Sequence, residues 1–252
     1  MSNKKAIRRI VLGVLNVIPF GIIRYFCDLS WFKKRYKIDF ERTFDLHFPS
    51  CRDFKFIQIG GNDGLSFDNL FDKVVNRNSL GIILEPSPKY FEKLKINYSN
   101  YPNIVLINKA IHPTESKFTL YEVNSEGLSK LPDWGQGIGS FDLQHLKNKN
   151  LKSSDISTLD VDCISFDNLI FQNPIFRKID FLQIDTEGFD GEILKNIDFS
   201  LFDVNMIKFE SCNLLENDLL SIESLLKLNG FLVLNDMYNS IAIKTPKALF
   251  FK

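Results

Sequence analysis

The sequence lacks the clustered cysteines and histidines that usually mark a metal site. Its 252 residues include four cysteines and three histidines, namely Cys27, Cys51, Cys163, Cys212, His47, His112 and His145. No two cysteines form a C-x-x-C pair and the histidines are far apart, so no zinc constellation is visible. Scattered cysteines are typical of a reducing compartment, so we expect the protein to be cytoplasmic.

The chain also lacks an apolar run that would cross a membrane. The apolar stretch at residues 10–23 has fourteen residues and is interrupted by glycine, asparagine and proline. A bilayer-spanning helix needs about 20 apolar residues. Aromatic residues follow the stretch in place of a small-x-small cleavage site, so a secretory signal peptide is not predicted.

Net charge is absent as well, because 31 basic residues balance 31 acidic residues, but the charges are unevenly distributed. Residues 1–37 carry nine basic residues and one acidic residue, which leaves 22 basic and 30 acidic residues for the remainder. The N-terminal segment therefore carries a charge of +8 and the rest of the chain −8. An acidic body argues against nucleic acid as a partner.

Two interpretations of residues 1–37 remain open. The segment either forms a helix that packs on the following domain, or attaches the protein peripherally to the cytoplasmic face of an anionic membrane. Each basic residue near such a surface contributes about 1 kcal/mol. Residues 38–53 carry little signal and are interpreted as a connector. Residues 1–53 are therefore assigned as an arm and connector, followed by one large domain at residues 54–252.

The most informative stretch is residues 54–64, FKFIQIGGNDG, in which an apolar run of strand type ends in a glycine-rich turn. Residues 65–76 follow with apolar residues at helical spacing. Strand, glycine turn and helix form the opening unit of an open α/β sheet, in which ligands bind beyond the carboxyl ends of the strands. Glycines let the backbone approach a ligand closely, and a helix N-terminus adds free N–H groups.

A second strand-like run at residues 80–84 ends in Glu85, where a carboxylate can accept both hydroxyls of a ribose. NAD and S-adenosylmethionine (SAM) both meet this requirement. A dinucleotide fingerprint needs G-x-G-x-x-G, but its first glycine would fall on Ile59, and the chain has Gly60-x-x-x-Gly64 instead. The glycine spacing therefore favours a methyl donor over a dinucleotide.

Polar residues also end the later strand-like runs, at Asn108–Ala110, Asp185–Gly188 and Glu210. In a parallel sheet these ends meet at one edge, and carboxylates gathered there oppose folding, which indicates function. The glycine-rich segment after Trp134 is either a lid or wall of the site or a plain surface loop. His145 lies in a short helical stretch, and such a lone histidine is more often a polar packing residue than a catalyst.

These segments resemble the FkbM-type SAM-dependent methyltransferases. The matching motifs are FIQIGGNDG at 56–64, ILEP at 83–86, NKAI at 108–111, GIGS at 137–140, IDFLQIDTEG at 179–188 and FE at 209–210. The resemblance covers about residues 54–245. It implies an α/β, Rossmann-like class I methyltransferase fold: a seven-stranded sheet flanked by helices, with the last strand antiparallel. It also implies SAM as the methyl donor and a hydroxyl oxygen, often of a sugar in a glycan, as the acceptor.

The strand ends and the resemblance together predict the site. The expected donor-binding residues are Gln58, Gly60, Gly61, Asn62, Asp63, Gly64, Glu85, Pro86, Asn108, Ala110 and Asp185. Many methyltransferases have an acid at the position of Gln58 to meet the donor's ammonium group, so Asp185 is expected to take that role here. Glu187 is the expected general base, and the further catalytic candidates are Asp185, Glu210 and His145. No metal is assigned, although the three carboxylates offer the hard oxygen ligands that magnesium prefers.

Two alternatives from other classes stay open. One is a donor-binding or scaffold protein with a degenerate site, against which the intact Gly60, Gly64, Glu85 and Asp185 argue. The other is a nicotinamide-dependent oxidoreductase, which the glycine spacing disfavours. The expected partner is a small-molecule or glycan acceptor, whose identity the sequence does not give, and the oligomeric state is equally open.

Overall fold

The computed structural model describes residues 40–49, 53–66, 69–132, 135, 137–235 and 238–244. The interpretations of residues 1–37 and of Trp134 concern residues outside these ranges. Inside them, none of the helices combines the length and the apolar character that a membrane crossing requires.

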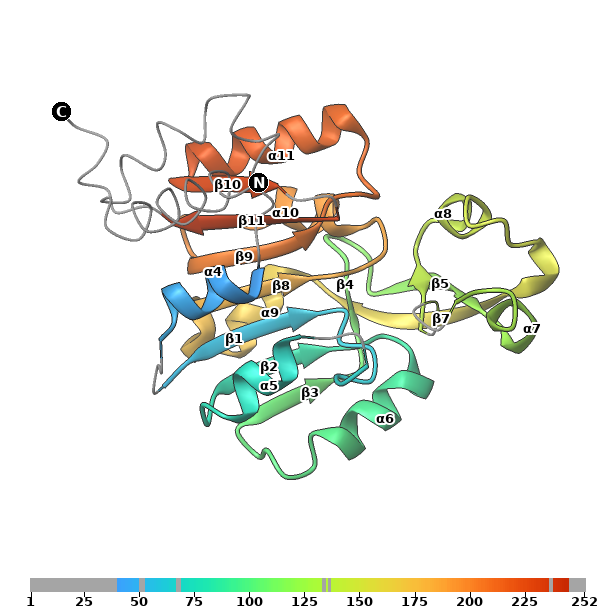
Figure 1. Ribbon diagram of the computed structural model, residues 1–252, viewed down its shortest axis with the longest axis horizontal. Helices are drawn as coiled ribbons and strands as arrows, with labels where there is room; N and C mark the ends of the chain where they lie inside the picture. The colour runs from blue at the N-terminus through green and yellow to red at the C-terminus, as the bar shows by residue number, and fades with distance from the viewer. Residues whose placement is uncertain are drawn as a thin grey trace, which may run out of the picture.

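The centre of the molecule is a mixed sheet of seven strands (Figure 1). The strands are β1 (Lys55–Ile59), β2 (Leu80–Leu84), β3 (Ile104–Ile107), β8 (Lys178–Ile184), β9 (Asp203–Glu210), β10 (Phe231–Asn235) and β11 (Asn239–Lys244). Among the strands that the structure describes in this sheet, the order is β10-β11-β9-β8-β1-β2-β3, and β11 alone runs against the others. The predicted class I methyltransferase arrangement, with its last strand antiparallel, is confirmed.

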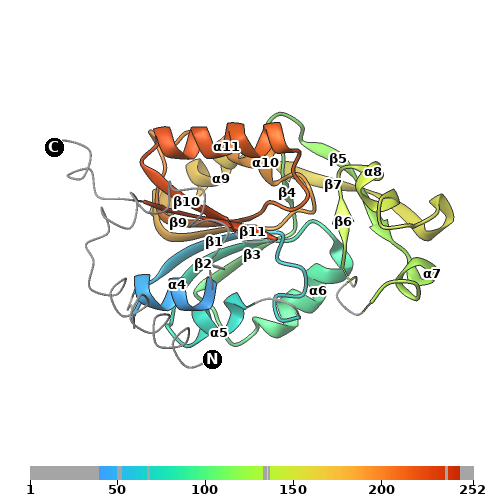
Figure 2. The same ribbon diagram turned by 45° about the horizontal axis from the view of Figure 1, so that its top comes forward.

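Helices cover both faces of this sheet (Figure 2). One face carries α4 (Phe40–His47), α5 (Leu70–Val75) and α6 (Pro88–Asn97), and the other carries α9 (Phe166–Gln172), α10 (Asp190–Lys195) and α11 (Glu216–Leu228). Side chains along β1 and the residue before it point alternately to the two faces of the sheet. Phe54 and Phe56 pack in the core under α4 and α5, whereas Ile57 and Ile59 pack in the core under α9 to α11. Burial on both faces explains why the central strands are almost continuously apolar.

Helix α4 belongs to the packed domain, so the interpretation of residues 38–53 as a connector is wrong for this stretch. The ring of Phe44 is fully buried, with its centroid 5.5 Å from that of Phe54 and 5.3 Å from that of Phe181. Phe40 and Phe48, four residues before and after Phe44, contribute to the same core. The helix was missed because its eight residues make only about two turns, too few for a clear period.

A second, smaller sheet lies beyond the carboxyl ends of the central strands (Figures 1 and 2). It contains β4 (Ala110–Ile111), β5 (Lys117–Val123), β6 (Gly139–Ser140) and β7 (Ile156–Ile164), in the order β4-β7-β5-β6. The short elements α7 (Ser125–Leu128), α8 (Leu143–Lys147) and η2 (Ser153–Asp155) connect its strands, and η3 (Pro174–Arg177) precedes β8. Strands β5 and β7 pair antiparallel, and the sheet was not predicted because two of its strands have only two residues.

Candidate active site

The glycine turn after β1 packs directly against the end of β8. Gly60 has a φ of +83°, and a Cβ atom there would lie 1.8 Å from the backbone oxygen of Asp185. The N–H groups of Gly60 and Gly61 both donate to the carbonyl oxygen of Leu84, at 3.0 and 2.9 Å. Only glycine fits so close an approach, so this turn brings the ends of β1, β2 and β8 to one point.

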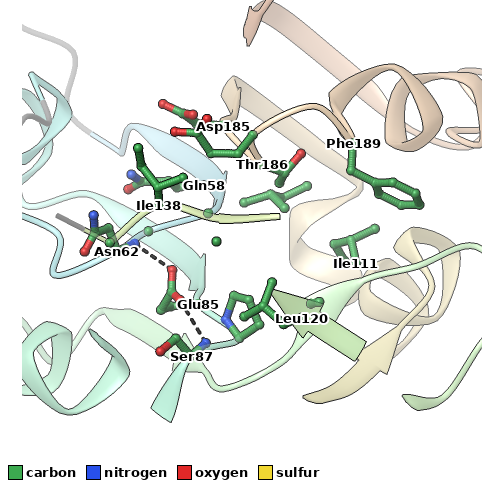
Figure 3. Close-up of a pocket in the computed structure, with 18 of the residues that line it drawn as sticks. Gln58, Asn62, Glu85, Ser87, Ile111, Leu120, Ile138, Asp185, Thr186 and Phe189 are labelled. Carbon is green, nitrogen blue, oxygen red and sulfur yellow. Dashed lines mark hydrogen bonds between the residues drawn. The ribbon is translucent and has the colours of Figure 1, made fainter. Parts of the chain in front are cut away.

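A cavity lies between these strand ends and the small sheet (Figure 3). The predicted site residues that line it are Gln58, Gly60, Gly61, Asn62, Glu85, Pro86, Ala110, Asp185 and Glu187. The predicted residues outside its lining are Asp63, Gly64, Asn108, Glu210 and His145. The strand ends therefore meet at one edge of the sheet, as the parallel topology predicts. Of the predicted residues gathered there, some face the cavity and others lie behind its lining.

Asp63 and Asn108 hold the loops that carry the lining residues. The Asp63 carboxylate accepts hydrogen bonds from the N–H and the hydroxyl of Ser66, both at 2.7 Å. Gly64, with a φ of +72°, continues the same turn. The Asn108 side chain donates to the carbonyl oxygen of Glu85 at 2.8 Å, which fixes the chain just after β2. These contacts place both side chains in supporting positions around the cavity.

Glu85 is fixed by backbone groups at one end of the cavity, which we call the Glu85 end. Its Oε2 accepts from the N–H of Asn62 at 2.7 Å, and its Oε1 accepts from the N–H of Ser87 at 2.8 Å (Figure 3). Burial raises the pKa of Glu85 to about 7, with a contribution from Glu122, while the two hydrogen bonds act to lower it. A carboxylate offers about four acceptor positions, so acceptor capacity remains for the hydroxyls of a ribose.

The opposite end of the cavity is lined by Asp185 and Glu187, with the Glu210 carboxylate near them outside the lining, and we call this group of three carboxylates the Asp185 end. The Asp185 side chain is accessible through the cavity, but its depth in the protein and the charges of Asp190, Glu210 and Glu187 raise its pKa well above the usual range. Burial and the charges of Glu187 and Asp190 likewise raise the pKa of Glu210 to about 7. Asp190 itself is fully buried and accepts from the N–H groups of Thr186 and Glu210, at 3.1 and 3.0 Å.

Glu187 has an unusual backbone and two cationic neighbours. Its φ of +52° lies in the left-handed region, which residues with a side chain seldom adopt. Its Oε2 lies 2.9 Å from His145 Nε2 and accepts from Lys149 Nζ at 3.2 Å. Burial alone would raise the pKa of Glu187, but the hydrogen bond with His145 and the charge of Lys149 lower it, so the carboxylate is ionised at neutral pH. His145 thus lies behind Glu187 and not in the cavity wall.

The described part of the glycine-rich loop, residues 137–140, forms a wall of the cavity. Gly137 has a φ of +90°, and a Cβ atom there would lie 2.2 Å from Asn62 Nδ2, so only glycine lets this loop approach the first glycine turn. Ile138 is buried and lines the cavity. The hydroxyl of Ser140 donates to the backbone oxygen of Glu187 at 2.8 Å, which ties the wall to the end of β8.

The magnesium site considered for the three carboxylates finds no support in this geometry. Across the ranges of the chain that the structure describes, no group of three or more histidine, cysteine, aspartate or glutamate side chains is arranged to hold a metal ion. Glu187 is instead engaged by His145 and Lys149.

Further lining residues were not predicted as site residues, and they are Ile59, Ser66, Ser87, Lys109, Ile111, Leu120, Glu122, Phe141, Gln183, Thr186, Phe189 and Lys208. For Gln183 and Lys208 a signal was present, because each is a polar residue near the end of a mainly apolar strand. Leu120, Glu122 and Phe141 belong to the small sheet or follow it directly, so they could not be placed without knowledge of that sheet.

The strand order and the cavity at the strand ends define a class I methyltransferase-like fold. The family model described as the methyltransferase FkbM domain matches residues 58–233, which is well over half of the chain. The chain therefore belongs to the FkbM family of SAM-dependent methyltransferases. This assignment agrees with the methyl donor predicted from the glycine spacing.

Several solved structures are similar to this chain at low identity. Precorrin-6y C5,15-methyltransferase from Geobacter metallireducens is 14% identical, with a TM-score of 0.41, over 84% of this chain and 92% of that one. The fibrillarin pre-rRNA processing protein of Methanococcus jannaschii is 15% identical, with a TM-score of 0.37, over 79% and 70%. The N-terminal domain of human METTL16 is 12% identical, with a TM-score of 0.42, over 81% and 67%. No curated protein matches the chain.

Proposed function

We propose that this methyltransferase transfers the methyl group of SAM to a hydroxyl oxygen of a sugar or glycan intermediate. The observation that carries the proposal is the position of Glu187, an ionised carboxylate that lines the cavity two residues after Asp185. A sugar hydroxyl holds its proton tightly, so its methylation requires a positioned group that accepts this proton. Glu187 is the group best placed to do so.

The cavity suits SAM on the chemistry of its side chains. Bound SAM supplies an electrophilic methyl group on a positively charged sulfonium. The acceptor capacity left on Glu85 matches the two hydroxyls of the donor's ribose. The carboxylates of the Asp185 end match its positive charges, because burial and neighbouring carboxylates raise the pKa of Asp185 and a bound cation would offset both effects. Asp185 would hold the ammonium group of the donor.

Glu187 would act mainly through its position. Its Oε2 is held by His145 and Lys149, whereas its Oε1 makes no hydrogen bond within the described residues. This arrangement fixes the carboxylate and leaves one oxygen to accept the proton of the acceptor hydroxyl. A lowered pKa weakens a base, so alignment of the two reacting groups must supply the larger part of the rate enhancement.

The wall next to Glu187 suits a sugar ring. Phe141 and Phe189 both line the cavity, with ring centroids 5.2 Å apart, and Leu120 and Ile111 extend the same apolar surface (Figure 3). A pyranose presents C–H groups on its faces and hydroxyls at its edge, so an apolar wall beside a carboxylate matches both. The same apolar wall keeps water from the reacting groups.

An acceptor screen tests the proposal directly. The full chain is incubated with SAM and separate sets of nucleotide sugars, lipid-linked glycans and, as controls, amine and carbon nucleophiles. S-adenosylhomocysteine formation is measured, and the position of the new methyl group is determined by NMR. We expect turnover with a sugar acceptor and a methyl group on oxygen. Turnover confined to amine or carbon nucleophiles would contradict the proposed acceptor.

A further inference from the structure

Two successive rows of side chains cross the centre of the sheet on the face covered by α4. The first row is apolar and fully buried, and consists of Phe56, Phe181 and Met206 in register on β1, β8 and β9. The row two residues further along the same strands is polar and lines the cavity, and consists of Gln58, Gln183 and Lys208. Along these strands, side chains on this face therefore pass from the buried core to the cavity lining within two residues, which is one repeat of the pleat. Polar side chains that line a cavity fix the orientation of a bound molecule, so such a row indicates a polar ligand.

Lys208 brings a positive charge into a cavity that is otherwise rich in carboxylates. Its Nζ lies 4.7 Å from the ring centroid of Phe40 on α4, and it makes no ion pair with any residue that the structure describes. Its charge reaches Asp185, where it opposes the effect of the neighbouring carboxylates. A half-buried ammonium that stacks on a ring and has no carboxylate partner is available to bind an anionic group.

We propose that Lys208 binds the carboxylate of the methionine moiety of SAM. This inference rests on the proposed use of the cavity for the methyl donor. The amino-acid end of SAM carries an ammonium and a carboxylate on one carbon. Asp185 directly follows β8, Lys208 lies on the neighbouring β9, and the two side chains offer the opposite charges. Gln183 lies on β8 two residues before Asp185, is paired with Lys208 on β9, and lines the same cavity.

The same arrangement accounts for an amide at position 58. A glutamate there would add an anion to the row that contains Lys208 and would compete with the donor's carboxylate for it. Because Asp185 already meets the donor's ammonium group, Gln58 can contribute hydrogen bonds without a charge. The departure of Gln58 from the acid found in many methyltransferases thus follows from the cation two strands away.

A comparison of two ligands tests the assignment. SAM and decarboxylated SAM, which lacks only the carboxylate, are titrated calorimetrically into the full wild-type chain and into Lys208→Met. We expect wild type to prefer SAM, and Lys208→Met to reduce this preference about tenfold, as loss of one charge-assisted hydrogen bond predicts. Lys208→Arg should keep most of the preference, because it keeps the charge.

Lys109→Met is the matched control. Lys109 also lines the cavity but follows β3, near the Glu85 end, so its loss removes a charge of the same sign without altering the preference between the two ligands. Equal affinities of wild type for SAM and decarboxylated SAM would overturn the assignment without any variant. An unchanged preference in folded Lys208→Met would overturn it as well. Failure of wild type to bind either ligand would instead refute the use of the cavity for SAM, and the role of Lys208 with it.

Discussion

The two ends of the cavity hold their carboxylates in opposite ways. At the Glu85 end a single carboxylate receives two backbone N–H groups, at 2.7 and 2.8 Å. At the Asp185 end three carboxylates act on one another, and the pKa of Asp185 is raised well above its usual range. Backbone hydrogen bonds thus fix Glu85, whereas burial and the charges of its neighbours destabilise the ionised form of Asp185 until a cation is added.

This difference matches the two halves of one ligand. A carboxylate fixed by rigid backbone suits the neutral hydroxyls of a ribose, because its remaining acceptor positions have set directions. A crowded set of carboxylates suits the sulfonium and ammonium charges of SAM, because each cation relieves repulsion when it binds. We therefore expect the polarity of the cavity to set the direction in which the donor lies. Substitutions at one end should therefore leave the other end intact.

The largest effect is expected at Glu187. Glu187→Gln keeps the shape of the side chain but removes the carboxylate that accepts the proton, so turnover should fall by about 100-fold or more. Donor affinity should be unchanged, since both ends of the donor keep their partners. Single-turnover kinetics and calorimetry separate the two quantities. Glu192→Gln on the exposed side of α10 is the control, and normal turnover in Glu187→Gln would reassign the base, with His145 tested next.

The main sheet and the glycine turn could be predicted from the sequence because their signals are local. Each central strand is an apolar run of strand type, and Gly60 marks the turn by itself. The small sheet could not be predicted, because β4 and β6 have two residues each and form only through pairing with distant strands. Helix α4 was missed because eight residues give too short a period.

The candidate site likewise contains residues that local sequence predicts and residues that only the folded chain places. Residues directly after a strand, such as Glu85 and Asp185, could be placed because strand ends share one edge of the sheet. The roles of Lys208 and Gln183 depend on the register between strands, which no single segment specifies. The partnership of His145 with Glu187 joins residues 42 positions apart, so only the folded chain reveals it.

The second prediction concerns the pH dependence of stability at the Glu85 end. The pKa of Glu85 rises from 4.5 to about 7 on folding, so the folded protein binds more protons than the unfolded chain between these values. Stability of the ligand-free protein should therefore fall as pH rises through this range, by an amount on the order of 3 kcal/mol from this residue. Glu85→Gln should flatten the dependence of the melting temperature between pH 5 and pH 8. An equally steep dependence in the variant would contradict the account, and Glu92→Gln on the exposed side of α6 is the control.

The third prediction concerns the Asp185 end. Asp185→Asn removes one of the mutually repelling carboxylates, so the ligand-free protein should melt at a higher temperature. The same change removes the partner of the donor's ammonium group and should weaken SAM binding about tenfold. Thermal unfolding and calorimetry measure the two effects on one sample. A lower melting temperature together with an unchanged dissociation constant would show that this carboxylate serves the fold and not the ligand.

The smallest effect is expected from the N-terminal segment. Residues 1–37 carry a charge of +8 and the remainder of the chain carries −8. We propose that the basic segment attaches the enzyme peripherally to an anionic membrane, with about 1 kcal/mol from each basic residue near the surface. The full chain should float with phosphatidylserine vesicles at low salt, and a chain beginning at Ile38 should not. If both forms stay in the soluble fraction, or if the shortened chain is unfolded, the segment belongs to the core.

The most direct test of the account is calorimetric titration of the wild-type chain with SAM and with NAD, repeated on Glu85→Ala. The account predicts that wild type binds SAM and not NAD. It also predicts that Glu85→Ala, with an unchanged circular dichroism spectrum, binds SAM at least about tenfold more weakly because hydrogen bonds to a charged acceptor are lost. Binding of NAD by wild type, or an equal dissociation constant for SAM in the folded variant, would contradict it.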